Sequence, residues 1–190
     1  MATGCRMPPT QRSEVQPVSD AATYAIRDYR PEDHEFLRDM SYEAAFWHPD
    51  VSRPPRDEAL SSPDLARYIE GWGRQGDAAV VAVGRADGAK MGAAWYRLMS
   101  EEAPGYGFVA PGVPEIGMGV AEAFRGRGVG GALLEALLGR ARSEGFGALS
   151  LSVEDGNDSA VRLYERHGFE RLFRAGDAWT MRAELSRSSA

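Results

Sequence analysis

Residues 115–134 read Glu-Ile-Gly-Met-Gly-Val-Ala-Glu-Ala-Phe-Arg-Gly-Arg-Gly-Val-Gly-Gly-Ala-Leu-Leu, and this stretch carries the clearest pattern in the chain. It predicts a short strand, a turn rich in glycine and arginine, and the first turns of an amphipathic helix. The backbone N–H groups at the start of such a helix have no intrahelical partner, so they attract an anion. The glycines let that anion approach the backbone, and Arg125 and Arg127 add positive charge beside it. We therefore expect a ligand that carries phosphate.

Two blocks of the sequence resemble one enzyme family. Arg125-x-x-Gly128-x-Gly130, after a strand that ends at Val120, resembles the pyrophosphate-binding signature of the GCN5-related N-acetyltransferases (GNAT). Residues 157–169, Asn-Asp-Ser-Ala-Val-Arg-Leu-Tyr-Glu-Arg-His-Gly-Phe, resemble a later helix of the same family. The resemblance implies an enzyme that binds acetyl-CoA and transfers the acetyl group to a primary amine of a small molecule or peptide, by direct attack in a ternary complex.

Length and charge limit the alternatives. With 190 residues, 43% hydrophobic and 26% charged, the chain can bury one core, which we expect at 23–185 between a flexible extension at 1–22 and a tail at 186–190. A net charge of -6 and a pI near 5.2 argue against nucleic acid as a partner. Cys5 offers no disulfide framework, and no apolar run reaches the ~20 residues that span a bilayer. We expect a cytoplasmic protein with no membrane partner.

The residues around the first stretch predict a mixed sheet. The order strand, turn, helix, strand from 115 to 153 is a βαβ crossover, so the strands at 115–120 and 149–153 should be parallel neighbours. Asp87-Gly88 is the signal of a two-residue hairpin in an antiparallel meander. The resemblance adds the GNAT fold, α/β (α+β), with about six to seven strands, largely antiparallel, one parallel pair that splays apart, and helices on the flanks.

Along the strand at 115–120, alternation places Ile116, Met118 and Val120 on one face and Glu115 with two glycines on the other. Such glycines mark either a bulge or a close neighbour. In the family, a pantetheine arm runs alongside this strand and bonds its backbone near Met118 and Val120. The residues expected to bind the cofactor are Met118, Val120, Arg125, Gly126, Arg127, Gly128, Val129, Gly130, Gly131, Asn157 and Tyr164.

The catalytic candidates are Tyr164 and Glu115. Tyr164 lies two helical turns after Asn157, on nearly the same side, and by resemblance it protonates the leaving thiolate, for which a phenol pKa of ~10 is suitable. A packing tyrosine and a helix N-cap are the structural alternatives for Tyr164 and Asn157. Glu115 is the candidate general base, directly or through water, although many enzymes of this family use no dedicated base and an exposed strand-end glutamate is common. The N–H of Val120 could stabilise the oxyanion.

The acceptor amine is harder to assign. By resemblance, the segment after the first helix lines the acceptor pocket, and the loop at 101–108 is a candidate rim. Aromatic residues that cap the core would show the same pattern. The three histidines have no metal-ligand spacing, so we expect no metal. The oligomeric state is open between a monomer and a homodimer. The candidate acceptor residues are Tyr42, Glu43, Phe46 and Trp47.

Two other functions fit parts of the sequence. Gly126-x-Gly128-x-x-Gly131, with Glu154 or Asp155 after the next strand, also matches a dinucleotide-binding fingerprint and hence a nicotinamide-dependent oxidoreductase. The antiparallel meander before it and the few elements after it disfavour that topology. A non-catalytic CoA-binding or regulatory module of the same fold would share every motif.

Overall fold

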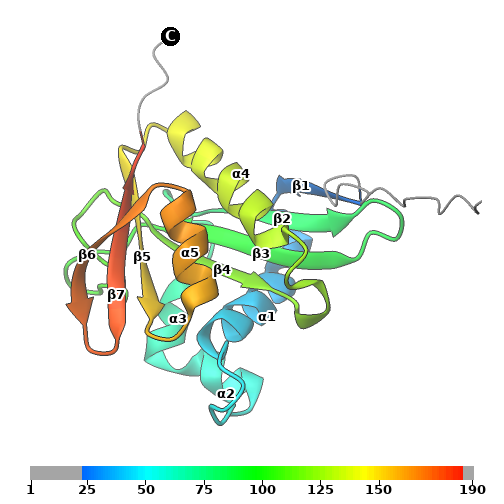
Figure 1. Ribbon diagram of the computed structural model, residues 1–190, viewed down its shortest axis with the longest axis horizontal. Helices are drawn as coiled ribbons and strands as arrows, with labels where there is room; N and C mark the ends of the chain where they lie inside the picture. The colour runs from blue at the N-terminus through cyan, green and yellow to red at the C-terminus, as the bar shows by residue number, and fades with distance from the viewer. Residues whose placement is uncertain (1–22, 186–190) are drawn as a thin grey trace, which may run out of the picture.

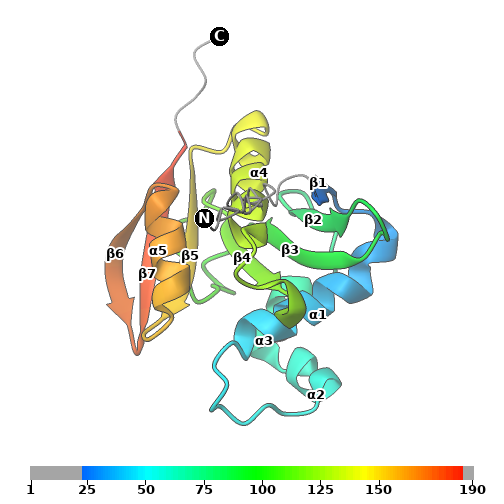
Figure 2. The same ribbon diagram turned by 45° about the vertical axis from the view of Figure 1, so that its right-hand side comes forward.

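The computed structural model describes residues 23–185, and these residues form a single seven-stranded sheet in the order β1-β2-β3-β4-β5-β7-β6. Strands β4 and β5 are parallel, whereas the other neighbours are antiparallel. Figures 1 and 2 show the helices arranged around this sheet. The predicted fold class is therefore confirmed. The expected extension at 1–22, with Cys5, and the tail at 186–190 lie outside the described residues.

The elements between 115 and 154 follow the predicted order of strand, turn, helix and strand. The strands are β1 (Tyr24–Asp28), β2 (Ala78–Gly84), β3 (Lys90–Arg97), β4 (Glu115–Val120), β5 (Ala148–Glu154), β6 (Phe169–Ala175) and β7 (Ala178–Glu184). The α-helices are α1 (His34–Ala45), α2 (Arg56–Ser61), α3 (Pro63–Ile69), α4 (Val129–Ser143) and α5 (Asp158–Arg166), and short 3-10 turns are η2 (Pro31–Asp33) and η3 (Glu122–Phe124).

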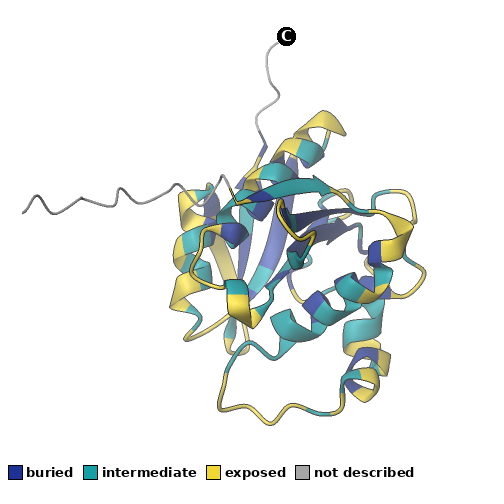
Figure 3. Ribbon diagram, turned by 90° about the vertical axis from the view of Figure 1, so that its right-hand side faces the viewer, coloured by how far each residue is buried: buried dark blue, intermediate teal, exposed yellow. Residues whose placement is uncertain are grey.

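Two apolar cores lie on opposite faces of the sheet. Leu133, Leu137 and other residues of α4 pack with β2 to β5, β7 and Tyr164 of α5 in one core. Leu37 and Met40 of α1 and Tyr68 of α3 pack against Trp95 of β3 in the other. In Figure 3 the buried residues accordingly concentrate in the strands and on the inner sides of the helices. The sheet is thus covered on both faces, and a ligand has to enter between its elements.

The parallel pair separates almost at once. Among the described residues, β4 and β5 share one registered pair, Glu115 opposite Ser150, next to a hydrogen bond from the Ser150 N–H to the Pro114 carbonyl (3.0 Å). Beyond it the strands diverge, as the resemblance implies. Because parallel ladders normally pair along their whole length, this divergence leaves backbone groups of β4 available to a ligand.

One local prediction needs correction, and one open alternative is decided. The turn after β2 is a hairpin, but its loop runs from Arg85 to Ala89 instead of two residues. The Gly84 carbonyl accepts from the Gly88 N–H (3.0 Å), and the Gly84 N–H donates to the Ala89 carbonyl (2.8 Å). Packing within the protein explains why β4 has glycine at two positions. A Cβ at Gly117 would lie 2.5 Å from the Trp95 ring, and one at Gly119 would lie 2.3 Å from the Met40 carbonyl oxygen.

Helix α4 begins and ends at glycines in left-handed conformation. Its N-cap, Gly128, has φ +79°, and Gly145 after its last turn has φ +85°. The Phe146 N–H bonds the Ala141 carbonyl (3.1 Å), which closes the C-terminus as a Schellman motif. Both ends of α4 are therefore fixed by local sequence. None of the described helices is long and apolar enough to cross a membrane.

Candidate active site

A cleft of about 1390 Å³ opens where β4 and β5 diverge. The end of α1 and the segment after it form one wall, and the start of α4 and one side of α5 form the other. The backbone of β4 lies along it from Glu115 to Val120. Of the residues predicted to bind or react, all except Tyr42 and Arg127 line this cleft.

The start of α4 supplies free donors at one end of the cleft. The first intrahelical hydrogen bond runs from the Ala132 N–H to the Gly128 carbonyl (3.2 Å), so the N–H groups of Val129, Gly130 and Gly131 are left for a ligand. Gly126 and Gly128 have φ of +73° and +79°, a conformation that places these donors and that glycine adopts without strain. A Cβ at Gly130 would make only ordinary contact with Leu163, at 3.5 Å. Packing within the protein therefore does not explain that glycine.

Arg125 has a second function besides its charge. Its Nε donates to the Val120 carbonyl (3.0 Å), and its Nη2 donates to Glu43 (2.8 Å). The side chain thus fixes the loop before α4 to both β4 and α1. Arg127 stacks on Phe124 at 5.7 Å from the ring centroid and does not line the cleft.

The backbone of β4 faces the opening. The Ala121 N–H donates to the Met91 carbonyl on the β3 side (2.9 Å). Because the direction of hydrogen bonding alternates along a strand, the N–H groups of Met118 and Val120 point to the side where β5 has moved away. These two donors are the ones that the resemblance assigns to the pantetheine arm.

Tyr164 and Asn157 both line the cleft from α5. Tyr164 is 8% exposed and packs edge-on against Phe169 at 5.7 Å between ring centroids, and burial raises the pKa of its phenol to about 12. Within residues 23–185 its hydroxyl has no hydrogen-bond partner. Asn157 serves as the N-cap, with Oδ1 accepting from the Ala160 N–H (3.2 Å). The structural function considered for Asn157 is therefore present, and the residue also lies where a ligand would pass.

Glu115 is buried, contrary to the exposed alternative, with 3% of its surface accessible. Its Oε1 accepts from the Tyr68 hydroxyl (2.7 Å) and the Gly107 N–H (2.8 Å), and Tyr68 accepts from the Tyr106 N–H (2.8 Å). Its Oε2 has no partner among the described residues. Burial raises the pKa of the Glu115 carboxyl, while the bonds from Tyr68 and Gly107 act in the opposite direction. A carboxyl with one unused oxygen can accept a proton there.

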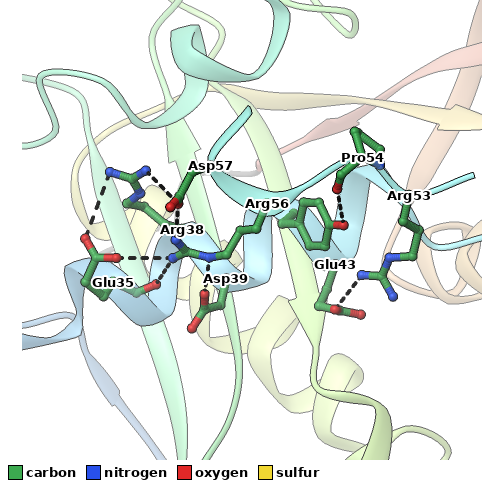
Figure 4. A network of polar contacts seen from close by, with 9 residues as sticks. Glu35, Arg38, Asp39, Glu43, Arg53, Pro54, Arg56 and Asp57 are labelled. Carbon is green, nitrogen blue, oxygen red and sulfur yellow. Dashed lines mark hydrogen bonds and ion pairs between the residues drawn. The ribbon is translucent and has the colours of Figure 1, made fainter. Parts of the chain in front are cut away.

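The residues predicted to contact the acceptor separate into two groups. Tyr42 points away from the cleft, since its hydroxyl donates to the Pro54 carbonyl (2.7 Å) and its ring lies beneath Arg53. Glu43 lines the cleft but is held by Arg53 (2.6 Å) and Arg125, and Figure 4 shows Arg53 reaching it. Phe46 and Trp47 line the cleft, and the Trp47 Nε1 donates to Glu154 on β5 (2.7 Å). Trp47 therefore connects the two walls.

Sequence reasoning missed Tyr68 as a site residue. It is separated from Glu115 by 47 positions, and only the packing of α3 beside β4 brings them together. The rim predicted at 101–108 is present in part, since Tyr106 lines the cleft and Gly107 bonds Glu115. Within the described part of the chain, no group of three or more His, Cys, Asp or Glu side chains could hold a metal ion.

Comparison with known proteins defines the class. Residues 27–169 match the acetyltransferase (GNAT) family, a span that covers both motifs and most of the sheet. The chain belongs to this family. The GNAT domain of S. lividans PAT has the same fold, with a TM-score of 0.65 at 20% identity over 88% of this chain and 93% of that one.

Among curated relatives, a mycothiol acetyltransferase of Corynebacterium aurimucosum is 35% identical over 132 residues, covering 67% of this chain and 40% of that protein. An L-methionine sulfoximine/L-methionine sulfone acetyltransferase of Pseudomonas aeruginosa is 44% identical over 46 residues, 24% of this chain and 27% of that protein. The chain spans between 40% and 46% of the length of the mycothiol acetyltransferases that it matches. The acceptors of those enzymes therefore do not transfer directly to this chain.

Proposed function

We propose that this protein is an N-acetyltransferase that moves an acetyl group from acetyl-CoA to a primary amine within a ternary complex. The observation that carries the proposal is the divergence of β4 from β5, which leads directly to the free N-terminus of α4. A long thioester with a pyrophosphate at one end fits such a groove. Family membership supports the same chemistry.

The residues of the chain would hold the donor at three places. The N–H groups of Val129 to Gly131 bind the pyrophosphate, and those of Met118 and Val120 bond the pantetheine arm. When bound, acetyl-CoA supplies an electrophilic thioester carbonyl. The Val120 N–H is the donor best placed to stabilise negative charge on that carbonyl oxygen.

Two side chains transfer protons in the proposed reaction. A phenol is protonated at neutral pH, and burial raises the pKa of Tyr164 further, so its unbonded hydroxyl holds a proton that it can give to the departing thiolate. Glu115 takes a proton from the acceptor ammonium, directly or through water; its Oε2 has no hydrogen-bond partner among the described residues, although Gly105 packs closely against it. Tyr68 and Gly107 hold the carboxyl in position through Oε1.

The first experiment is calorimetric titration of the protein with acetyl-CoA, NAD and NADP. We expect acetyl-CoA alone to bind, and we expect Gly128→Glu to remove that binding because it places a carboxylate in a left-handed position beside the anion site. Binding of a nicotinamide dinucleotide without acetyl-CoA would refute the proposal.

A second assay separates an enzyme from a silent CoA-binding module. Thiol release from acetyl-CoA is followed with a panel of amines, and product is identified by mass. Acetyl-CoA binding without turnover of any amine, including peptide N-termini and aminoglycosides, would favour the non-catalytic alternative.

We propose in addition that the protein can form a homodimer through β6. This strand is at the edge of the sheet and exposes Leu172 (46%) and Phe173 (47%). An open strand edge that carries two exposed apolar side chains can pair with another strand. Light scattering on the parent and on Phe173→Lys tests this, and a parent that is monomeric at all concentrations would refute it.

A further inference from the structure

Acidic residues dominate the lining of the cleft. Of the 28 Asp and Glu residues in the sequence seven line it, whereas two of the 22 Lys and Arg residues do. The acids are Glu43, Glu58, Asp64, Glu115, Glu154, Asp155 and Asp177, and the cations are Arg125 and Arg166.

The two cations belong to the phosphate end. Arg125 is in the loop before α4, where it is already bonded to Val120 and Glu43. Arg166 lies on α5 nearly one turn beyond Leu163, and Leu163 is the residue that a Cβ at Gly130 would meet. Positive charge in the cleft is therefore concentrated beside the start of α4.

The acceptor end combines acids with aromatic rings. Tyr106 stacks on Tyr68 at 6.3 Å between centroids, and burial together with Asp64 and Glu154 raises the pKa of Tyr106. Beneath these rings lies Glu115, buried and with Oε2 unpartnered within the described residues. Carboxylates and aromatic faces both attract ammonium groups. Gly105 packs against Oε2, so it is the acids that line the cleft, together with the aromatic rings, that favour a cationic ligand at this end.

An acceptor carboxylate would find no counter-charge here. The nearest cation to Glu115 and Tyr106 is Arg67, whose Nε, Nη1 and Nη2 donate to the Pro63 carbonyl (3.1 Å), the Pro104 carbonyl (2.5 Å) and Asp64 (2.7 Å). Arg67 does not line the cleft. An amino acid acceptor would bring its carboxylate beside Glu115 and Glu154, and the Arg67 charge is already paired with Asp64, so the contact is unfavourable.

We propose that the acceptor is a diamine or polyamine: an alkyl chain with a primary amine at the reacting end, a second ammonium group further along, and no carboxylate. This inference rests on the proposed acetyl transfer and narrows its substrate. Glu115 faces the reacting amine, and the acids at the mouth, Glu58 and Asp177 among them, attract the second ammonium group.

Three matched probes test the proposal: cadaverine, pentylamine and L-lysine. Pentylamine lacks the second ammonium group of cadaverine, and lysine adds a carboxylate to it. Each is titrated calorimetrically into protein saturated with CoA, so that the readout does not depend on turnover. We expect cadaverine to bind about tenfold more tightly than either of the others, and the difference to shrink as salt is added.

The double variant Glu58→Gln/Asp177→Asn tests whether these two carboxylates attract the second ammonium group. Both side chains are exposed, and neither forms an ion pair within residues 23–185, so the fold should tolerate the change. We expect the preference for cadaverine over pentylamine to fall several-fold while pentylamine affinity stays constant. Glu135→Gln, a change of the same charge on the outer side of α4, is the control and should leave both affinities unchanged.

Lysine binding as tightly as cadaverine, or cadaverine no more tightly than pentylamine, would overturn the inference while leaving acetyl transfer intact. So would acetylation of peptide N-termini with no binding of cadaverine. Failure of CoA itself to bind would instead refute the proposed function, and that outcome is seen in the first titration.

Discussion

At the scale of single residues, Tyr164 is the clearest test of the proposed chemistry. We expect Tyr164→Phe to keep its affinity for acetyl-CoA and to lose about 10²- to 10⁴-fold in kcat, because only the proton donor is removed. Steady-state kinetics beside calorimetry measure both quantities. An unchanged kcat would reduce Tyr164 to a packing residue against Phe169.

The hydrogen bond from Tyr68 should be visible in the pH dependence. That bond lowers the pKa of Glu115, whereas burial raises it. Tyr68→Phe removes the lowering contribution, so the pKa rises and the carboxyl becomes a base only at higher pH. We therefore expect the acid limb of the kcat/KM profile to move to higher pH and activity to recover in alkaline buffer.

Tyr42→Phe is the matched control, since Tyr42 does not line the cleft and its hydroxyl bonds the Pro54 carbonyl instead of Glu115. Glu115→Gln should abolish the acid limb altogether. A profile for Tyr68→Phe that coincides with that of the parent would exclude Glu115 as the titrating base.

These residues also mark the limit of what the sequence could predict. Glu115 and Tyr164 were predicted because they lie in motifs read along a continuous strand and helix. The Tyr68–Glu115 and Trp47–Glu154 contacts join positions 47 and 107 apart. No local pattern encodes such pairings, because they depend on how α1 and α3 pack beside the diverging strands.

At the scale of elements, the local sequence was enough to define a strand or a helix end where a single glycine or an alternating run of residues determines it. The predicted strand at 115–120 is β4, and Gly145, in a left-handed conformation, ends α4. The hairpin after β2 was predicted too short, because Asp87 accepts the Ala89 N–H (3.0 Å) and so extends the turn. The sequence alone could not explain why positions 117 and 119 are glycine, since the atoms that leave no room for a side chain there come from β3 and α1.

Glycine substitutions in α4 can separate an effect on the stability of the protein from an effect on acetyl-CoA binding. Gly130 is helical and has room for a Cβ, so Gly130→Ala should keep or raise the free energy of unfolding, by up to about 0.5 kcal/mol. The added methyl group lies 3.5–3.8 Å from Leu163, Met118 and Val120, which line the cleft, so it narrows the space beside the phosphate site and we expect acetyl-CoA affinity to fall about tenfold. Denaturant unfolding and calorimetry measure the two effects.

Gly139→Ala is the control within the same helix. No atom lies within 4 Å of its Cβ position, and it does not line the cleft. It should give a similar gain in stability with unchanged affinity. Equal affinities for both variants and the parent would mean that the glycines of α4 have no part in holding the phosphates.

At the scale of the whole molecule, the acceptor end depends on how firmly α3 is held to the sheet. Arg97 on β3 is fully buried and forms a double hydrogen bond with Asp77 (2.9 and 2.7 Å). Its Nη1 donates to the carbonyls of Arg67 and Glu70 at the end of α3 (both 2.8 Å). One guanidinium thus joins β3, α3 and the following loop, and it fixes the helix that carries Tyr68.

Asp77→Asn should therefore destabilise the entire fold. It leaves the Arg97 charge buried without a counter-ion, and we expect a loss of about 3–5 kcal/mol in the free energy of unfolding by urea denaturation. Asp28→Asn, which breaks the exposed pair with Arg140 (3.1 Å), should cost less than about 1 kcal/mol. Replacing both buried partners, as Arg97→Met/Asp77→Leu, should cost less than Asp77→Asn alone, because no unpaired charge remains. If the double variant were instead the less stable one, the hydrogen bonds from Arg97 to α3, and not its charge, would be what holds the acceptor helices in place.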